Sequence, residues 1–142
     1  MEDIERFEEA KRKYIVTKVL YEFIFKEVCR RNRVWHEKLE RGEITEGEWA
    51  EKTTDEEFKP VTVRLSLNLK FTISLDDARR RLRECEEELL DTGAKLLICI
   101  SSKEEAETVK YVFEEGRKHC SVRDKIIDLL LRWNVSELKK YA

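Results

Sequence analysis

The chain has 142 residues, the length of one ordinary domain, and carries no stretch that resembles a flexible linker. Charged residues make up 42% and hydrophobic residues 41% of it, a balance that allows a buried core and argues against intrinsic disorder. The formal net charge is −2, so no overall field draws the protein toward nucleic acid or anionic lipid. We therefore predict a single domain over residues 1–142, with any polyanion site confined to a local patch.

The composition also indicates an origin and a compartment. Glutamine is absent while lysine, arginine and glutamate are abundant, a usage typical of hyperthermophile proteins. Charged side chains interrupt the most apolar stretch, 14–29, well short of the roughly 18 apolar residues that a membrane span needs. The acidic N-terminus lacks the pattern of a secretory signal. We expect a cytoplasmic protein of a hyperthermophile or its virus, without a membrane partner.

Apolar residues over 3–41 recur at alternating three- and four-residue steps, which predicts one long helix. Between 15 and 24 other faces of this helix are apolar too, so we expect surrounding protein to cover it. The aromatic side chains of the main stripe are candidate anchors for a partner. These are Phe7, Tyr14, Tyr21, Phe25 and Trp35.

Strict alternation of apolar and polar residues predicts one long strand with a buried face from Val61 to Ile73. Its apolar positions are Val61, Val63, Leu65, Leu67, Leu69, Phe71 and Ile73. A straight strand of this length would run about 43 Å at roughly 3.3 Å per residue. We therefore expect a bulge, a bend or an arm that reaches a second subunit.

A helix over 74–91 and a buried strand over 95–100 follow, which predicts a strand-helix-strand unit with a parallel crossover. Further helices are expected at 103–115 and 122–133. Two strands are too few for a stable sheet, so we expect a homo-oligomer in which the long strand pairs with its symmetry mate. The predicted fold class is α+β, with a helical arm over 1–58 and an α/β core over 59–142 whose small sheet is completed by oligomerisation.

Local signals mark where the helices begin and end. Capping boxes predict helix starts at Thr45, Thr54, Ser74, Ser102 and Ser121, and helix ends are expected at Gly42, Gly93, Gly116 and Asn134. Ser102 follows a predicted buried strand, a position that can bind phosphate in open α/β folds. Because Glu104 and Glu105 put negative charge in that first turn, an ordinary N-cap is the favoured interpretation.

The cysteines at 29, 85, 99 and 120 and the histidines at 36 and 119 are the candidate metal ligands and nucleophiles. They lack the closely spaced pairs typical of zinc sites, so we predict no metal and no other cofactor. Buried or incidental thiols are the favoured interpretation, and a disulfide is an alternative. No arrangement of these residues or of the carboxylates predicts a catalytic site.

Two features suggest nucleic-acid binding as an alternative function. The polar strand face carries two cations and no acid, and paired β-ribbons use such a face to read DNA. The helix over 74–91 has its arginines first and its glutamates second, against the helix dipole. The residues predicted for this function are Arg64, Ser66, Asn68, Lys70, Arg79, Arg80 and Arg83. A solvated sheet face, and pairs of Arg80 with Glu84 and Arg83 with Glu87, are the competing interpretations.

These patterns together favour a non-catalytic interaction, assembly or regulatory protein. We expect it to form a homo-oligomer and to bind a protein partner.

Overall fold

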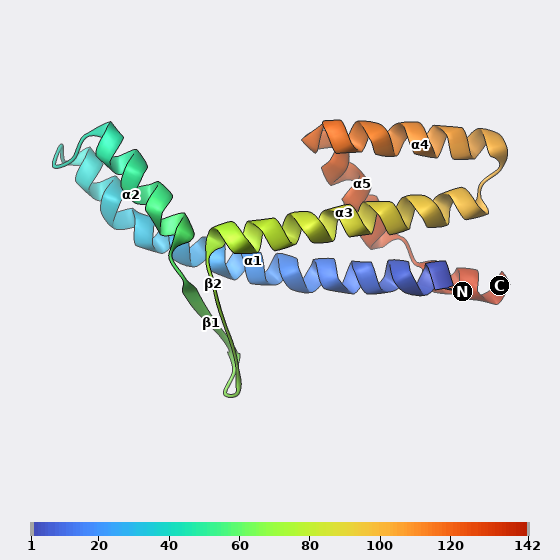
Figure 1. Ribbon diagram of the computed structural model, residues 1–142, viewed down its shortest axis with the longest axis horizontal. Coiled ribbons are helices and arrows are strands. Elements are labelled where there is room, and N and C mark those ends of the chain that lie inside the picture. Colours follow the sequence, from blue (N-terminus) through green and yellow to red (C-terminus); the bar gives the residue numbers. More distant parts are fainter. Residues whose placement is uncertain (1, 142) are drawn as a thin grey trace. The chain divides into compact units, whose positions relative to one another are not determined.

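Within residues 2–141, which the structure describes, the computed structural model contains five α-helices and one two-stranded antiparallel sheet (Figure 1). In chain order the elements are α1 (Glu2–Glu40), α2 (Glu46–Phe58), β1 (Val61–Ser66), β2 (Leu69–Ile73), α3 (Leu75–Ile100), α4 (Lys103–Lys118), α5 (Cys120–Arg132) and the 3-10 helix η1 (Val135–Tyr141). The protein is mostly helical, and the α+β class is confirmed in this broad sense. The side chains of Leu65, predicted on the apolar strand face, and of residues 139–141 lie outside the described part.

The chain divides into two compact units. Unit 1 comprises Met1–Ile15 with Arg83–Ala142, and unit 2 comprises Val16–Leu82. The helices α1 and α3 each run through both units, with 2–15 and 83–100 in unit 1 and 16–40 and 75–82 in unit 2. The boundary predicted between residues 58 and 59 coincides with neither of these divisions.

Unit 1 is a helical bundle built around the first turns of α1. Phe7 is completely buried, and its ring lies 5.5 Å from that of Trp133, centroid to centroid. Lys11 Nζ donates a hydrogen bond of 2.8 Å to the Trp133 carbonyl oxygen and so ties the chain after α5 to α1. The other buried apolar side chains of this unit are Ile4, Ala10, Tyr14, Leu89, Leu90, Leu96, Phe113, Ile126, Ile127, Leu130 and Val135.

The strand predicted at 95–100 is wrong, because these residues form the last turns of α3. Gly93 lies inside α3 and does not end it. This position is close-packed, because a Cβ here would lie 2.9 Å from both terminal methyl groups of Leu130. A short apolar run fits a buried strand or a buried helical turn equally well. The helix is favoured here because Leu96 continues the seven-residue spacing of Leu82 and Leu89, all three of which are buried. The strand-helix-strand unit therefore does not form.

The single long strand is also wrong, because β1 and β2 form an antiparallel hairpin. Its register pairs Val61 with Ile73 and Val63 with Phe71, so odd-numbered residues face odd-numbered residues across the ladder. The alternation therefore matches on both strands from 61–64 to 70–73, while at the tip Ser66 lies across from Leu69, and the turn at 67–68 contains neither glycine nor proline. A bulge between Arg64 and Ser66 shifts the register near the tip. Since the strand pairs within its own chain, pairing with a symmetry mate is not required.

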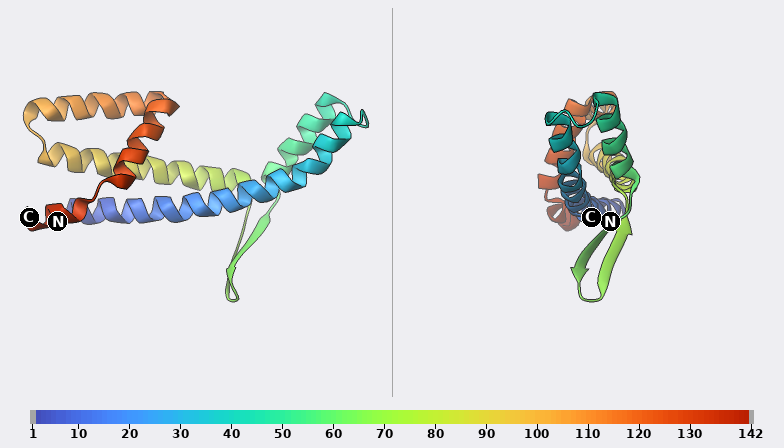
Figure 2. Two further views of the ribbon diagram at one scale, coloured as in Figure 1. Left: turned by 180° about the vertical axis from the view of Figure 1, so that it is seen from behind. Right: turned by 90° about the vertical axis from the view of Figure 1, so that its left-hand side faces the viewer.

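The core of unit 2 lies where the base of the hairpin meets α1 and α3. It consists of Ile24, Val28, Val61, Ile73, Leu75 and Ala78, with Leu20, Tyr21 and Val63 packed against it. Beyond this base, the hairpin extends away from α1 and α2 (Figures 1 and 2). The expectation that protein surrounds α1 between 15 and 24 is wrong within the described chain, because Val16, Val19 and Phe23 are exposed.

The helix α2 folds back beside the end of α1. Gly42 ends α1 as predicted and adopts a φ of 73°, the left-handed region that glycine favours. Trp49 Nε1 donates a 2.8 Å hydrogen bond to His36 Nδ1, which joins the two helices. The capping box of Thr45 with Glu48 starts α2, and Thr54 lies inside this helix rather than at a start.

Two of the three remaining helix-start predictions are confirmed, and one is wrong. Ser74 accepts a 3.1 Å hydrogen bond from the Asp77 backbone N–H at the start of α3, and Ser102 forms the predicted capping box with Glu105. Ser121 is wrong as an N-cap, because His119 holds that position and Ser121 lies in the first turn of α5. Gly116 is wrong as a helix end, since α4 continues to Lys118.

Candidate functional site

The apolar face of the hairpin is covered at its base and uncovered toward its tip. Val61 and Ile73 are buried, and Val63 is half-buried against the core of unit 2. The next apolar side chains on β2 are exposed, with 37% of Phe71 and 49% of Leu69 accessible. Cover by α1 therefore ends about halfway along the hairpin, and large apolar side chains continue beyond it.

A stripe of exposed apolar residues lies on α1. Val16, Val19 and Phe23 are separated by three and four residues and therefore lie on one side of the helix. Phe23, 52% exposed, is the member of this stripe that lies next to the hairpin, where it lines a groove of about 420 Å³ together with Pro60 and residues 61–64 of β1. We call Val16, Val19, Phe23, Leu69 and Phe71 the apolar surface.

Two of the charged side chains that line this groove, Glu27 and Arg31, pair with each other, and Arg64 also lines it. Arg31 Nη1 donates a 3.3 Å hydrogen bond to the Pro60 carbonyl oxygen, and Arg31 Nε lies 3.3 Å from Glu27 Oε1. Glu27 also accepts hydrogen bonds of 2.6 and 2.9 Å from Arg30. The hydrogen bond from Arg30 lowers the pKa of Glu27, so this carboxylate stays ionised. The groove therefore combines apolar side chains such as Phe23 and Val63 with paired charges, and the paired Glu27 is not an acid or base poised for catalysis.

The opposite, polar face of the hairpin carries an uncompensated charge pair. Arg64 on β1 lies directly across from Lys70 on β2, and both side chains are exposed. Within the described part of the chain neither of them forms an ion pair. One step toward the base, the hydroxyl groups of Thr62 and Thr72 are hydrogen-bonded to each other at 3.1 Å. The hairpin thus brings together the cations that the alternation had placed on one face.

Two arginines of α3 form ion pairs, unlike Arg64 of the hairpin. Arg79 Nη2 lies 3.2 Å from Glu57 of α2, and Arg80 pairs with Asp76 at 3.0 Å. Arg80 therefore uses a carboxylate one turn before it instead of the predicted Glu84. Arg83 is exposed and belongs to unit 1, whereas Arg79 and Arg80 belong to unit 2. Of the seven predicted nucleic-acid residues, the hairpin holds four: Arg64, Ser66, Asn68 and Lys70.

The five predicted aromatic anchors lie in different environments. Phe7 and Tyr14 are buried in the core of unit 1 and are occupied by contacts within the chain. Tyr21 and Phe25 stack with their ring centroids 6.0 Å apart, and Phe25 is exposed. Trp35 is half-buried beneath Lys38 and Lys52, whose ammonium groups lie 4.9 and 5.5 Å from its ring centroid. The sequence stripe did not identify Val16, Val19 or Phe23, which lie on the adjoining face of the same helix.

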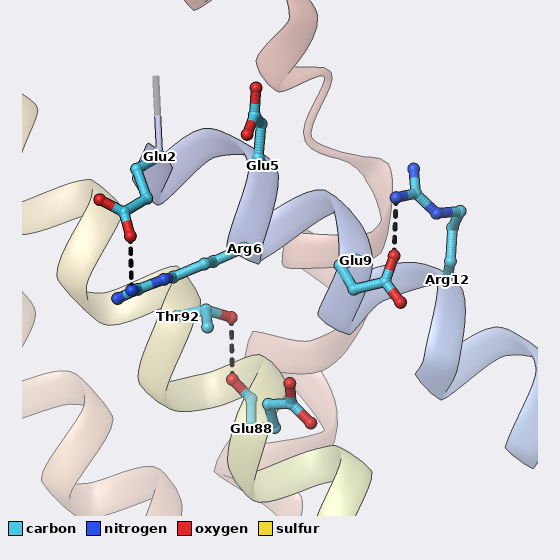
Figure 3. A pocket seen from close by; sticks show the side chains of 7 residues that line it. All are labelled: Glu2, Glu5, Arg6, Glu9, Arg12, Glu88 and Thr92. Atoms are coloured by element: carbon cyan, nitrogen blue, oxygen red, sulfur yellow. Dashed lines mark hydrogen bonds and ion pairs between the residues drawn. The ribbon is translucent and has the colours of Figure 1, made fainter.

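A second groove, in unit 1, is lined by charged side chains of α1 and α3 (Figure 3). It has a volume of about 590 Å³ and is lined by Glu2, Glu5, Arg6, Glu9, Arg12, Glu88 and Thr92. Both arginines are engaged by carboxylates of their own helix, Arg6 with Glu2 at 2.6 Å and Arg12 with Glu9 at 2.8 Å. The hydrogen bond from Arg12 lowers the pKa of Glu9. Both arginines of the groove are therefore occupied by carboxylates of their own helix and are not free to bind an anionic substrate.

The cysteines and histidines do not form a site in the described part of the chain. No group of three or more metal-ligating side chains occurs among residues 2–141, and no disulfide joins the cysteines described there. Cys29, Cys99 and Cys120 are exposed, and Cys85 is half-buried. Ser102 caps α4 with Glu105 as an ordinary N-cap. None of the described helices is both long enough and apolar enough to cross a membrane.

Comparison with known proteins found no matching family model, no matching curated protein and no matching solved structure.

Proposed function

We propose that the protein is a non-catalytic assembly protein that self-associates through the apolar surface of unit 2. The observation that carries this proposal is the exposure of Phe23 on α1 and of Phe71 on β2, beside a half-covered hairpin. Phe23 lines the same groove as Val63, and Val63 lies across the ladder from Phe71. The two aromatic side chains therefore belong to one neighbourhood rather than to scattered positions.

The physical reason for association is the cost of leaving this area in water. Burial of apolar surface contributes about 25 cal/mol per Å². An isolated two-stranded hairpin is marginally stable at best, and a cover on its apolar face stabilises it. A second copy supplies the same apolar side chains and can bury both surfaces at once, as two-fold interfaces do. Aromatic side chains such as Phe23 and Phe71 commonly supply most of the energy of such contacts.

The setting of this function follows from composition. Lysine plus arginine total 29 and aspartate plus glutamate total 31 in a chain without glutamine, which suits an assembly protein of a hyperthermophile or its virus. The proposal places the protein in the cytoplasm, where it acts in a structural or regulatory role.

Size-exclusion chromatography with light scattering tests the proposal on three proteins. We expect the wild type to elute as a dimer or larger species at high micromolar concentration. The double variant Phe23→Ser and Phe71→Ser should elute as a monomer with an unchanged helical circular dichroism spectrum. Tyr111→Ser is the matched control, because Tyr111 is an exposed aromatic residue on α4 in unit 1. A wild type that stays monomeric, or a double variant that associates like the control, contradicts the proposal.

A further inference from the structure

We infer that the polar face and the tip of the β1–β2 hairpin form an arm that binds duplex DNA, with Arg64 and Lys70 on phosphates and Leu67 against the base pairs. This inference goes beyond self-association, since it uses the hairpin face opposite to the apolar surface. It rests on three independent features of the hairpin: its charge pair, its polar groups and its tip.

The first feature is the charge pair. Directly opposed residues of an antiparallel ladder have Cβ atoms about 4.5–5.5 Å apart, so Arg64 and Lys70 repel each other in the free protein. Other cations of unit 2 are differently placed, since Lys59 lies 3.0 Å from Glu56 and Arg79 lies 3.2 Å from Glu57. Carboxylates are abundant in this chain, yet the hairpin from 61 to 73 has none. An anion between the two cations would remove the repulsion, which indicates a phosphate ligand.

The second feature is the set of neutral polar groups around this pair. Thr62 and Thr72 lie next to it toward the base, and Ser66 and Asn68 lie toward the tip, all of them exposed. Hydroxyl and amide side chains hydrogen-bond phosphates and sugars together with arginine and lysine, and these contacts fix the orientation of a protein on the duplex. Thr62 and Thr72 therefore share a face with the two cations, whereas Ser66 lies across from Leu69 beyond the bulge and Asn68 lies in the turn.

The third feature is the apolar residue at the tip. Leu67 is 91% exposed in the turn between the strands, where glycine, asparagine or aspartate is usual. It gains no burial in the free protein. DNA-binding proteins that act through the minor groove insert leucine and similar side chains between base steps and kink the duplex. An exposed leucine at the end of a protruding hairpin (Figure 2) is placed for that contact.

Duplex DNA is favoured over a single strand because the hairpin face that carries Arg64 and Lys70 has no aromatic side chain. Single-strand binding relies on aromatic side chains on which bases stack. The aromatic residue of the hairpin, Phe71, pairs with Val63 on the apolar face and is absent from the face of Arg64 and Lys70.

Fluorescence anisotropy with a labelled mixed-sequence DNA duplex tests the inference at about 50 and 200 mM salt. We expect wild-type binding to weaken by at least roughly tenfold over this range, because each phosphate contact contributes about 0.9 to the slope of log affinity against log salt. The double variant Arg64→Ala and Lys70→Ala should lose about 2 units of that slope. Lys110→Ala with Arg132→Ala removes the same charge from unit 1 and should keep the wild-type slope.

A second variant separates the tip from the charges. Leu67→Ser should weaken binding while leaving the salt slope unchanged, and it should reduce the bend that energy transfer between the labelled DNA ends reports. Lys70→Glu serves as a folding control, since it replaces repulsion by attraction within the hairpin and yet should abolish binding.

Four outcomes would overturn the inference. They are no binding to duplex at the lower salt, equal slopes for the hairpin double variant and its control, tighter binding to the single strand, and undiminished binding by Lys70→Glu. Because these variants leave the apolar surface intact, light scattering on the same samples reports self-association separately.

Discussion

Gly93 of α3 lies so close to Leu130 of α5 that a Cβ on the glycine would meet both terminal methyl groups at 2.9 Å. Phe7 of α1 would lie 3.3 Å from the same Cβ. Three helices of unit 1 therefore meet at a position that has no side chain. This close approach keeps a helix-weakening residue in the interior of α3.

The first prediction concerns this approach. Alanine normally stabilises a helix interior by about 1 kcal/mol relative to glycine, but overpacking of a core costs roughly 1–3 kcal/mol. We therefore expect Gly93→Ala to lower the free energy of unfolding by about 1 kcal/mol, as measured by urea denaturation. Gly47→Ala is the control, since a Cβ there would meet Thr45 Oγ1 at an ordinary 3.8 Å. A more stable Gly93→Ala protein would show that the packing is looser than described.

A second prediction concerns the aromatic pair of unit 1. Phe7 is fully buried against Trp133, so Phe7→Ala removes a large side chain from the core and leaves a cavity. The expected loss of stability is about 3–5 kcal/mol. Phe25→Ala removes the same side chain from an exposed position and should cost about 1 kcal/mol or less. Thermal unfolding followed by circular dichroism compares the two, and equal losses would be inconsistent with the described burial.

These packing relationships mark the limit of prediction from the sequence. The helices α1, α2, α4 and α5 were predictable because local sequence patterns indicate them. Examples are the capping boxes of Thr45 and Ser102, which start α2 and α4. Gly93 was wrongly predicted to end a helix, because the residue that leaves no room for a side chain there, Leu130, is 37 positions further along the chain. The turn at 67–68 was missed because, on the base side of the bulge, odd-numbered residues lie across from odd-numbered residues, so both strands together read as one alternating strand.

The candidate site was predictable to a similar degree. Period-two alternation placed Arg64 and Lys70 on one face, and the hairpin register confirms this placement. The sequence did not indicate that Phe23 and Phe71 stay exposed, because an apolar residue on a regular face is ordinarily a core residue. Whether such a face is covered depends on how far neighbouring elements reach, which no local pattern encodes.

The third prediction tests the charge pair within the hairpin. Lys70→Glu turns a like-charged cross-strand pair into an opposite-charged one, a difference worth up to about 1 kcal/mol. Amide hydrogen exchange in β1 and β2 should therefore become slower in this variant. Lys26→Glu makes the same charge change on an exposed position of α1 and should leave hairpin exchange as it is. Faster hairpin exchange in Lys70→Glu would contradict the described register.

The fourth prediction concerns acid pH. Hydrogen bonding to Ser102 lowers the pKa of Glu105, and hydrogen bonding from Arg30 lowers that of Glu27. A carboxyl whose folded pKa lies below its unfolded value stabilises the protein above the unfolded pKa and loses this contribution as pH falls through the folded pKa. Stability should therefore decline as pH drops below the ordinary glutamate range.

Variants at these carboxyls check the sign. Unfolding midpoints of Glu27→Gln with Glu105→Ala should change less between neutral and acid pH than those of the wild type. Glu104→Ala is the control, because Glu104 lies in the same first turn of α4 but is not the carboxylate of the capping box, and this variant should leave the pH dependence unchanged. An equally steep decline in the double variant would assign the acid sensitivity to other groups.

If a second copy covers the apolar surface of unit 2, amide hydrogen exchange of the wild type depends on protein concentration. Measuring this exchange at a low and a high protein concentration tests self-association directly. We expect slower exchange at high protein concentration in β1, in β2 and in the turns of α1 from 16 to 23. The exposed turns of α4 should exchange at the same rate in both samples. Identical exchange of the hairpin at the two concentrations, in samples spanning the micromolar to millimolar range, would contradict the claim.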